Sequence, residues 1–491
     1  MLKRLIGILI LATVAVAIWM NTHKTVPEVE PDAATEKAAI SVGLQPIIRV
    51  ENRPPILMTL KERMATHKVP GVSIAVMRGD KIVLTHTEGV LEEGSDTPVD
   101  AETLFQAASI SKPAFATILM RYRERYGLDL DTNVNNLLKS WKVPAHDWEG
   151  TDDVTLRRLL SHTAGTTVHG FPGYAAGEDV PSLVQLLDGV PPTNTAPILV
   201  NLQPGTQYRY SGGGTSVAQL VLEDVSGRQL TDMAAEYLFE PTGMTQSVFA
   251  QPLPESYRLN AAAPHDRVGE VVPGGAHTYA ALAAAGLWTT PSDILKWASS
   301  IRKANTGREG EVVSPASARD MLTNPLGPVG VGFFIDEENG ARSFGHGGAN
   351  QGFRANFFIY TESGDGIAVM TNSVNGGYLT REVIHRAAEI YGWDDVQPPV
   401  RRALDMPAEA LQELAGNFTI TTPVNNSATI IVEGDTLILS ADGYFPSEVL
   451  FPEEQDKFFS GVGNSLVFNR NDAGAVTGFE YRGYVKATKD D

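Results

Sequence analysis

The spacing of apolar and polar positions predicts a sheet that is assembled from two distant parts of the chain. Segments that alternate apolar and polar residues occur before residue 90 and again after residue 328, with helical periodicity around and between them. Strands are predicted at residues 72–77, 81–87, 329–335, 353–360 and 366–371. Helices are predicted at residues 54–68, 114–122, 215–225, 292–301 and 380–391. This order favours an α+β fold: an antiparallel sheet flanked by helices, with a mainly helical inserted region and a cleft at the junction.

A second, all-β unit is predicted beyond the sequence Pro398-Pro399-Val400-Arg401-Arg402. Residues 398–407 have the composition of a linker, and short strand-like segments separated by turn residues follow. They lie at residues 429–432, 436–439, 457–460, 465–469 and 478–481. We therefore expect a first domain at residues 51–397 and a small β-barrel-like domain, a barrel or a half-sandwich, at residues 408–491.

The N-terminus has the pattern of an export signal. Lys3 and Arg4 precede an apolar run from Leu5 to Met20, in which Ala15-Val16-Ala17 suits a signal-peptidase site. An uncut run of this length would instead reach across a bilayer as an anchor. Residues 1–20 are predicted to be a signal peptide or an anchor, and residues 21–50 a linker. We expect an exported protein, periplasmic or secreted, which an uncut N-terminal segment would hold at the inner membrane.

Composition narrows the range of partners. The 39 basic and 58 acidic residues give a net charge of −19, which disfavours binding to nucleic acid or to anionic lipid. No nucleic-acid partner is expected, and membrane contact is expected only through the N-terminal segment. The chain has no cysteine, which excludes disulfides, thiolate metal ligands and a cysteine nucleophile. A nucleophile must therefore be sought among other side chains.

The segment Ser109-Ile110-Ser111-Lys112 suggests such a nucleophile. A serine hydroxyl is weakly nucleophilic at neutral pH and needs a base within hydrogen-bond reach. If a helix begins at Ser109, the Lys112 amine lies one turn along the same face. Pro113 then falls in the first turn, where its missing N–H breaks no helical hydrogen bond. A second Ser-x-x-Lys match, at residues 300–303, lies at the end of a predicted amphipathic helix and is interpreted as a solvated helix end.

Two further segments complete a recognisable set: Tyr210-Ser211-Gly212 and His346-Gly347-Gly348. Additional landmarks lie at residues 159–165, 204–206 and 286–293. In order and spacing these segments resemble the class C β-lactamase-like serine hydrolases, a group with penicillin-binding enzymes, D-aminopeptidases and family VIII esterases. The resemblance covers about residues 56–393 and implies the β-lactamase and transpeptidase type of fold.

The resemblance also implies catalytic roles. Ser109 would be the acylated nucleophile and Lys112 its base partner. Tyr210 would share protons with Lys112 and the leaving group, and a phenol that merely packs under the sheet is the alternative. The backbone N–H groups of Ser109 and Ala349 would form the oxyanion hole.

The predicted substrate-binding residues are Gly212, His346, Gly347, Gly348 and Ala349, and two of them depart from the family pattern. Gly212 occupies the place of an asparagine whose amide grips the acylamino group in relatives that cleave β-lactams or D-alanine peptides. His346 stands where many relatives bind a substrate carboxylate with lysine, and a neutral imidazole gives a weaker, pH-dependent contact. Gly347 and Gly348 would let a substrate backbone lie alongside, although they also suit a tight strand edge.

These departures from the family pattern determine how we rank the candidate substrates. The expected substrate is a small-molecule or short-peptide acyl compound: an ester first, an amide or D-amino-acid peptide second, and a β-lactam third. A non-catalytic ligand-binding protein on the same fold is the alternative of another class. No cofactor is implied, and the histidines show no metal-ligand spacing.

Other readings of single residues remain open. His162 could belong to a Ser-His-Asp arrangement with Asp152 or Asp153, but a loop brace near the cleft is the more plausible role. The Gly-x-Ser-x-Gly nucleophile elbow does not occur in the sequence. Three aromatic residues are interpreted either as core or as walls of an acyl pocket: Phe171, Tyr174 and Trp288.

Overall fold

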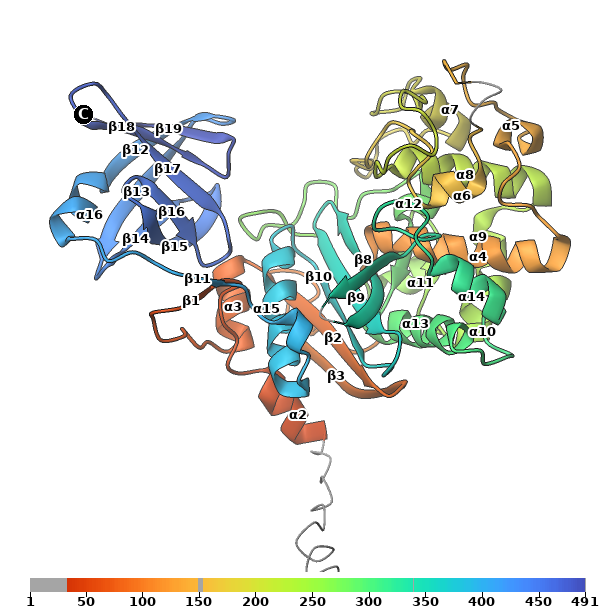
Figure 1. Ribbon diagram of the computed structural model, residues 1–491, viewed down its shortest axis with the longest axis horizontal. Coiled ribbons are helices and arrows are strands. Elements are labelled where there is room, and N and C mark those ends of the chain that lie inside the picture. The colour runs from red at the N-terminus through yellow and green to blue at the C-terminus, as the bar shows by residue number, and fades with distance from the viewer. Residues whose placement is uncertain (1–32, 149–152, 339, 491) are drawn as a thin grey trace, which may run out of the picture.

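Six antiparallel strands form the central sheet of the first domain, in the order β3–β2–β10–β9–β8–β7 (Figure 1). The computed structural model describes residues 33–148, 153–338 and 340–490. The strands are β2 (Gly71–Arg78), β3 (Lys81–Gly89), β7 (Phe334–Glu338), β8 (Ala341–Asn350), β9 (Phe353–Tyr360) and β10 (Gly366–Thr371). The sheet thus joins segments from both ends of the domain, and the predicted α+β class is confirmed.

Helices cover both faces of this sheet. One face carries α2 (Ala33–Ile40), α3 (Leu60–His67) and α15 (Gly376–Tyr391), and the other carries α13 (Pro291–Asn305). Alternate side chains of β2 point to the two faces of the sheet. Ile74 packs in one buried cluster with Leu379, whereas Ala75 packs in the other with Trp297. Because side chains alternate between faces, burial on both sides explains why β2 is almost continuously apolar.

The inserted region lies between β3 and β7, and Figure 1 shows it on the side of the sheet away from α15. Its helices are α4 (Ser111–Tyr126), α5 (Val134–Leu137), α6 (Leu156–Leu160), α7 (Leu183–Asp188), α8 (Gly212–Ser226), α9 (Leu230–Ala234), α10 (Glu240–Thr242), α11 (Glu255–Arg258), α12 (Leu282–Ala285) and α14 (Pro315–Met321). Three short strands, β4 (Phe105–Gln106), β6 (Leu287–Thr289) and β5 (Val248–Phe249), form a small sheet in that order. Short turns of other helix types are η1 (Ala108–Ile110), η2 (Ala235–Phe239) and, after α15, η3 (Asp394–Val396).

Several predicted elements of this domain differ in extent from the observed ones, and two differ most. The helix predicted from residue 54 begins only at Leu60, because Thr59 caps it and shares a capping box with Glu62. The strand predicted at residues 329–335 is formed instead by β7, from Phe334 onward, and β8 was anticipated only as a possible tight strand edge at its glycines. The glycines of β8 weaken its intrinsic strand preference, and pairing with β9 forms the strand nevertheless.

The C-terminal domain is a closed barrel of eight strands in sequential order. They are β12 (Gly416–Thr422), β13 (Asn426–Glu433), β14 (Thr436–Ala441), β15 (Phe445–Glu454), β16 (Lys457–Ser460), β17 (Ser465–Arg470), β18 (Val476–Tyr481) and β19 (Val485–Lys489). Helix α16 (Ala408–Leu414) adds Leu411 and Leu414 to the apolar core of the barrel. Of the two predicted forms, barrel and half-sandwich, the structure forms the barrel, with β12, β15 and β19 beyond the predicted strands.

The segments that flank the first domain meet beside the barrel (Figure 1). Strand β1 (Arg49–Val50) pairs in parallel with β11 (Val400–Arg401), and Val50 packs with Phe451 and Phe459 of the barrel. The predicted signal or anchor at residues 1–20 lies outside the described residues. In the part of the chain that the structure describes, no helix has both the length and the apolar character needed to cross a membrane.

Candidate active site

The nucleophile candidate and its base candidate lie at the start of α4, in hydrogen-bond contact. Ser109 belongs to the single turn η1, and Lys112 lies one turn further along, as the spacing predicted. The Lys112 Nζ atom is 2.9 Å from Ser109 Oγ and 2.9 Å from the Ala284 carbonyl oxygen, which accepts a hydrogen bond from it. Ala108, directly before Ser109, has a φ of 50°, a strained backbone conformation for a residue with a Cβ atom.

Burial changes the protonation of Lys112. Only 3% of the residue is exposed, and this loss of water lowers the pKa of the amine to about 7. No carboxylate of the described residues is paired with it. A substantial fraction of Lys112 is therefore uncharged at neutral pH, which a proton acceptor for Ser109 requires.

Tyr210 stands over this pair. The Lys112 amine lies 5.0 Å from the centroid of the Tyr210 ring. Burial raises the pKa of Tyr210 to about 12, and a hydrogen bond with the Ser109 side chain acts in the opposite direction. The phenol therefore keeps its proton at neutral pH and suits proton donation better than service as a phenolate base.

Two histidines pack against the Tyr210 ring. The ring centroids of His162 and His169 lie 4.4 Å and 4.8 Å from that of Tyr210. The Ser211 backbone N–H donates to His162 Nδ1 at 3.2 Å, and burial followed by the Lys112 charge holds the pKa of His162 well below its usual value. His162 is thus a neutral ring that supports Tyr210 and the start of α8.

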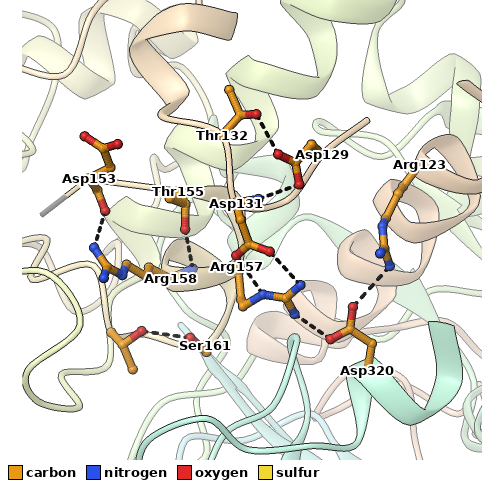
Figure 2. Close-up of polar contacts among 11 residues, drawn as sticks. Arg123, Asp129, Asp131, Thr132, Asp153, Thr155, Arg157, Arg158, Ser161 and Asp320 are labelled. Atoms are coloured by element: carbon orange, nitrogen blue, oxygen red, sulfur yellow. Dashed lines mark hydrogen bonds and ion pairs between the residues drawn. The ribbon is translucent and has the colours of Figure 1, made fainter. Parts of the chain in front are cut away.

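The Ser-His-Asp alternative does not match these contacts. The Asp153 side-chain carboxylate accepts a hydrogen bond from Asn133 at 2.8 Å. The Asp153 backbone carbonyl accepts one from Arg158 (Figure 2). Asp152 lies outside the described residues. Figure 2 also shows how α6, which leads into His162, is fixed: Arg157 pairs with Asp131 and with Asp320.

The glycine-rich part of β8 forms the edge beside Ser109. A Cβ atom on Gly348 would lie 2.2 Å from the Ala107 carbonyl oxygen, so only glycine lets η1 approach the strand this closely. A Cβ atom on Gly347 would meet nothing nearer than 3.7 Å, because that side faces a cavity. The strand therefore presents open backbone next to the Ser109 hydroxyl.

His346 lies in the same strand without a charge. Its Nδ1 atom is 2.6 Å from the Gly347 carbonyl oxygen, and its Nε2 atom has no partner among the described residues. Burial, and then the Lys112 charge, lowers the pKa of His346 to about 3. At neutral pH His346 does not supply the fixed positive charge that a lysine at this position would.

Gly212 does not occupy the substrate-binding position that was predicted for it. Its backbone N–H donates to the His169 carbonyl at 3.0 Å, and this contact draws the segment 168–172 over the start of α8. Gly212 is buried beneath that segment and does not line the cavity, whereas His169, Phe171 and Pro172 do. A Cβ atom on Gly212 would lie 3.1 Å from both the His169 carbonyl oxygen and the Phe171 ring.

A cavity of about 1010 Å³ connects these groups. It brings together Ser109, Tyr210 and the residues of β8 from His346 to Ala349, while Lys112 lies buried beneath its floor. Of the three aromatic candidates, Phe171 lines the cavity, whereas Tyr174 and Trp288 are buried outside it. Residues of the cavity wall that the sequence did not reveal include Tyr208, Phe334, Arg354, Asn356, Thr380 and Arg381. They belong to no recognisable motif. The pairing of β8 with β7 and β9 and the packing of α15 bring all of them except Tyr208 to the cavity, and Tyr208 lies in the loop before α8.

In the described part of the chain, neither the C-terminal barrel nor a metal-binding cluster contributes to this cavity. The residues that line it all belong to the segment 109–381, so the barrel contributes none of them. Within the described segments, no three His, Cys, Asp or Glu side chains gather into a group that could hold a metal ion.

Comparison with known proteins identifies the family. The model of the Beta-lactamase family matches residues 58–390, and the chain belongs to that family. It is a serine hydrolase of the β-lactamase-like type, as the recognised motifs predicted.

The relatives differ in how much of each protein is shared. Penicillin-binding protein 4 of Amycolatopsis lactamdurans is 28% identical over 337 residues, which cover 64% of this chain and 83% of that protein. A D-aminopeptidase of Brucella ovis is 25% identical over 291 residues, or 59% of this chain and 53% of the relative. The chain thus spans about half the length of that D-aminopeptidase.

A solved structure shares the fold over most of the chain. The octameric penicillin-binding protein homologue from Pyrococcus abyssi is 22% identical with a TM-score of 0.57, and the match covers 87% of this chain and 98% of that one. Residues 1–407 make up only about 83% of the 491 residues, so the match extends into the barrel.

Proposed function

We propose that this protein hydrolyses carboxylic esters or amides in two steps, through an acyl-enzyme on Ser109. The observation that carries the proposal is the 2.9 Å contact between Lys112 Nζ and Ser109 Oγ, made by an amine whose burial lowers its pKa to about 7. This arrangement supplies a nucleophile with a base in place at neutral pH. Structural lysines rarely lose their charge, because they are seldom buried without a carboxylate partner.

In the first step, Ser109 Oγ forms a bond to the substrate carbonyl carbon while its proton passes to the neutral Lys112 amine. The carbonyl oxygen becomes an oxyanion, which the backbone N–H groups of Ser109 and Ala349 would stabilise. The bond from carbon to the leaving oxygen or nitrogen then breaks. Tyr210 gives its proton to the leaving group and regains one from the Lys112 ammonium, so that Lys112 ends the step uncharged.

In the second step, water takes the place of the leaving group. Lys112, acting through Tyr210, accepts a proton from the water as its oxygen bonds to the acyl carbon. The bond from that carbon to Ser109 Oγ breaks, and the serine recovers its proton. The net change is the addition of one water molecule to the ester or amide bond.

Among substrates, we rank an ester first, an amide or D-amino-acid peptide second and a β-lactam third. The neutral state of His346 and the buried place of Gly212 support this order, because neither supplies the contacts that β-lactams and D-alanine peptides receive in relatives. The similarity to a D-aminopeptidase and to a penicillin-binding protein supports the amide as the second candidate.

Covalent labelling tests the proposal. The protein should gain the mass of one fluorophosphonate adduct, and Ser109→Ala should abolish both the adduct and the hydrolysis of p-nitrophenyl esters while the circular dichroism spectrum stays unchanged. The second serine of the motif pattern, Ser300, is buried and donates to Glu311, not solvated as predicted. It supplies a matched control, since Ser300→Ala should still label at Ser109. An adduct that persists in Ser109→Ala would refute the assignment.

A substrate panel orders the candidates. Specificity constants for p-nitrophenyl esters, D-aminoacyl anilides and nitrocefin should decrease in that order, and a larger constant for nitrocefin would reverse the ranking. The non-catalytic alternative predicts no turnover of any of them. Ser109-dependent turnover of one substrate would discard it.

We also propose that the protein is exported and acts on a small-molecule or short-peptide substrate, without a nucleic-acid partner. The charged start and the apolar run from Leu5 to Met20 support export, and the net charge of −19 supports the absence of nucleic acid. Fractionation of cells that produce the full chain tests this: the protein should appear in the envelope or medium, with its N-terminal residue showing whether the run is removed. Recovery in the cytoplasm would contradict it.

A further inference from the structure

The charged side chains that line the cavity are of one sign. Among the residues that the structure describes, Arg354 and Arg381 lie in its wall, and no aspartate or glutamate does. This contrasts with a chain that carries 58 acidic and 39 basic residues. Since acids outnumber bases in the whole chain, a cavity without a single acid is a specific feature and not a reflection of composition.

Arg354 is held in place without a charge partner. Its Nη1 atom donates to the carbonyl oxygens of Asn350 at 2.8 Å and Phe353 at 2.7 Å, which orients the guanidinium. Burial, together with the nearby charge of Arg267, lowers the pKa of Arg354. Among the described residues, no carboxylate pairs with Arg354 or with Arg381. A partly buried guanidinium that is fixed by carbonyl groups and lacks a counter-ion is a ready site for an anion.

Arg354 lines the same cavity as Ser109. Arg354 is the cross-strand partner of Ala349, so the two side chains lie on the same face of the sheet. The same wall continues with Gly377 and Thr380 in the first turns of α15, whose N-terminal end carries a partial positive charge. Arg381, exposed on α15, stands further out on that wall.

Another part of the cavity wall is aromatic and apolar. Phe171, Pro172, Tyr208 and Phe334 line it. A substrate that fits both parts of the wall has an apolar group and, on the side of β9 and α15, an anionic group. A free ammonium group, such as an aminopeptidase substrate carries, would instead meet arginines and no carboxylate.

We propose that Arg354, assisted by Arg381, forms a carboxylate subsite, so that the preferred ester or amide carries a free carboxylate and not a free amine. This inference rests on the proposed function, because it concerns the substrate of the same site. Arg354 acts as the orienting group through paired hydrogen bonds to the carboxylate, and Arg381 adds attraction at the outer rim.

Two pairs of uncharged and anionic esters test the proposal. One pair differs in the leaving group, 3-carboxyphenyl against 3-carbamoylphenyl phenylacetate, and the other in the acyl group, the p-nitrophenyl monoester of glutarate against that of its monoamide. In at least one pair, the specificity constant of the carboxylate ester should be about tenfold or more above that of the matching uncharged ester. A tenfold ratio is equivalent to about 1.4 kcal/mol. The pair that responds identifies the side of the scissile bond on which the carboxylate lies.

Variants assign the preference to the arginines. Arg354→Met should bring the ratio within each responsive pair close to one, Arg354→Lys should keep part of it, and Arg381→Gln should lower it by a smaller factor. Arg319→Gln, which removes an exposed positive charge outside the cavity, should leave the ratio unchanged. Equal rates for both members of both pairs in the unmodified protein, or a preference that survives Arg354→Met, would overturn the subsite.

A binding measurement separates this inference from the proposed function. In Ser109→Ala, calorimetry with the two phenylacetate esters and the two glutarate-based esters should still show tighter binding of one carboxylate than of its amide, with a difference that falls as salt is added. If the unmodified protein hydrolyses none of the esters but this difference remains, the hydrolase proposal fails and the subsite stands. If hydrolysis occurs without any difference in binding or rate, the subsite fails alone.

Discussion

The Lys112 amine nitrogen lies 2.9 Å from the Ser109 hydroxyl oxygen, although only 3% of the lysine is exposed to solvent. The two facts depend on one another. A solvated lysine at this distance would be an ammonium ion, which can donate to the hydroxyl but cannot accept its proton. Burial therefore allows Ser109 and Lys112, two residues at a common helical spacing, to act as a nucleophile and its base.

The first prediction concerns pH. Because the pKa of Lys112 is lowered to about 7, the uncharged fraction rises with pH, and kcat/KM for a chemically stable ester should rise through a midpoint near pH 7. About one pH unit below the midpoint, the activity should be roughly tenfold below its plateau. The pKa of Tyr210 near 12 predicts no fall from this phenol below about pH 10. Steady-state kinetics between pH 5.5 and 9 measures the profile, and a flat profile would contradict the role of Lys112.

His346 supplies the control for that profile. Its pKa is lowered to about 3, so its charge does not change between pH 5.5 and 9. His346→Gln is expected to change the height of the profile while leaving the midpoint in place. A midpoint that moved or vanished in this variant would assign the titration to the imidazole.

The second prediction concerns stability. The pKa of Lys112 is about 10.5 in the unfolded chain and about 7 in the folded one, so between these values the unfolded state binds more protons. The free energy of unfolding therefore rises with pH over this range, and the buried lysine costs stability at neutral pH. Lys112→Met should raise the free energy of unfolding at pH 7 by up to a few kcal/mol while abolishing activity. Urea unfolding at pH 7 and pH 10 should show the advantage shrinking at the higher pH; a constant difference would contradict this account.

The third prediction uses two neighbouring glycines. Gly348→Ala places a Cβ atom 2.2 Å from the Ala107 carbonyl oxygen and must push η1 away from β8, so ester hydrolysis should fall at least about a hundredfold. Gly347→Ala meets nothing nearer than 3.7 Å in the protein and is the matched control for strand preference. It should keep the same fluorophosphonate labelling rate within a few fold. Equal losses in the two variants would show that backbone flexibility, and not the contact with Ala107, is what matters.

The fourth prediction concerns the family asparagine. Gly212→Asn should not create β-lactam hydrolysis, because the new side chain would have to displace the His169 carbonyl and the Phe171 ring, each 3.1 Å from its Cβ atom. The expected result is a fall in ester hydrolysis together with a lower melting temperature, measured beside nitrocefin turnover. A gain in nitrocefin hydrolysis without loss of stability would show that segment 168–172 yields easily.

The sequence predicted those parts of the fold in which local pattern and tertiary structure agree. β2, β9 and β10 are short apolar runs between turn residues, and all three appear within two residues of their predicted ends. β8 has the opposite property, because the glycines that suit the site weaken the strand pattern, and its pairing with β9 is a tertiary effect. The extent of the strand that carries the substrate edge was consequently not predicted from the sequence.

The active site also contains residues that sequence motifs predicted and residues that only the fold brings together. Ser109, Lys112, Tyr210 and His346 lie in motifs whose order is recognisable, and the fold brings them together as expected. Arg354 has no such signal, because an arginine in a strand is ordinary until a cavity forms beside it. Gly212 was placed by its motif alone, and the hydrogen bond to His169 that buries it could not be read from the sequence.

The close approach of η1 to β8 at Gly348 also limits how this protein can acquire new substrates. A larger residue at position 348 would disturb the nucleophile itself, so this point of contact is closed to change. The walls formed by segment 168–172 and by α15 contain neither Ser109 nor Lys112, so changes there are expected to alter substrate contacts first. Diversification within such a scaffold is therefore expected to preserve one side of the cleft and to remodel the other two.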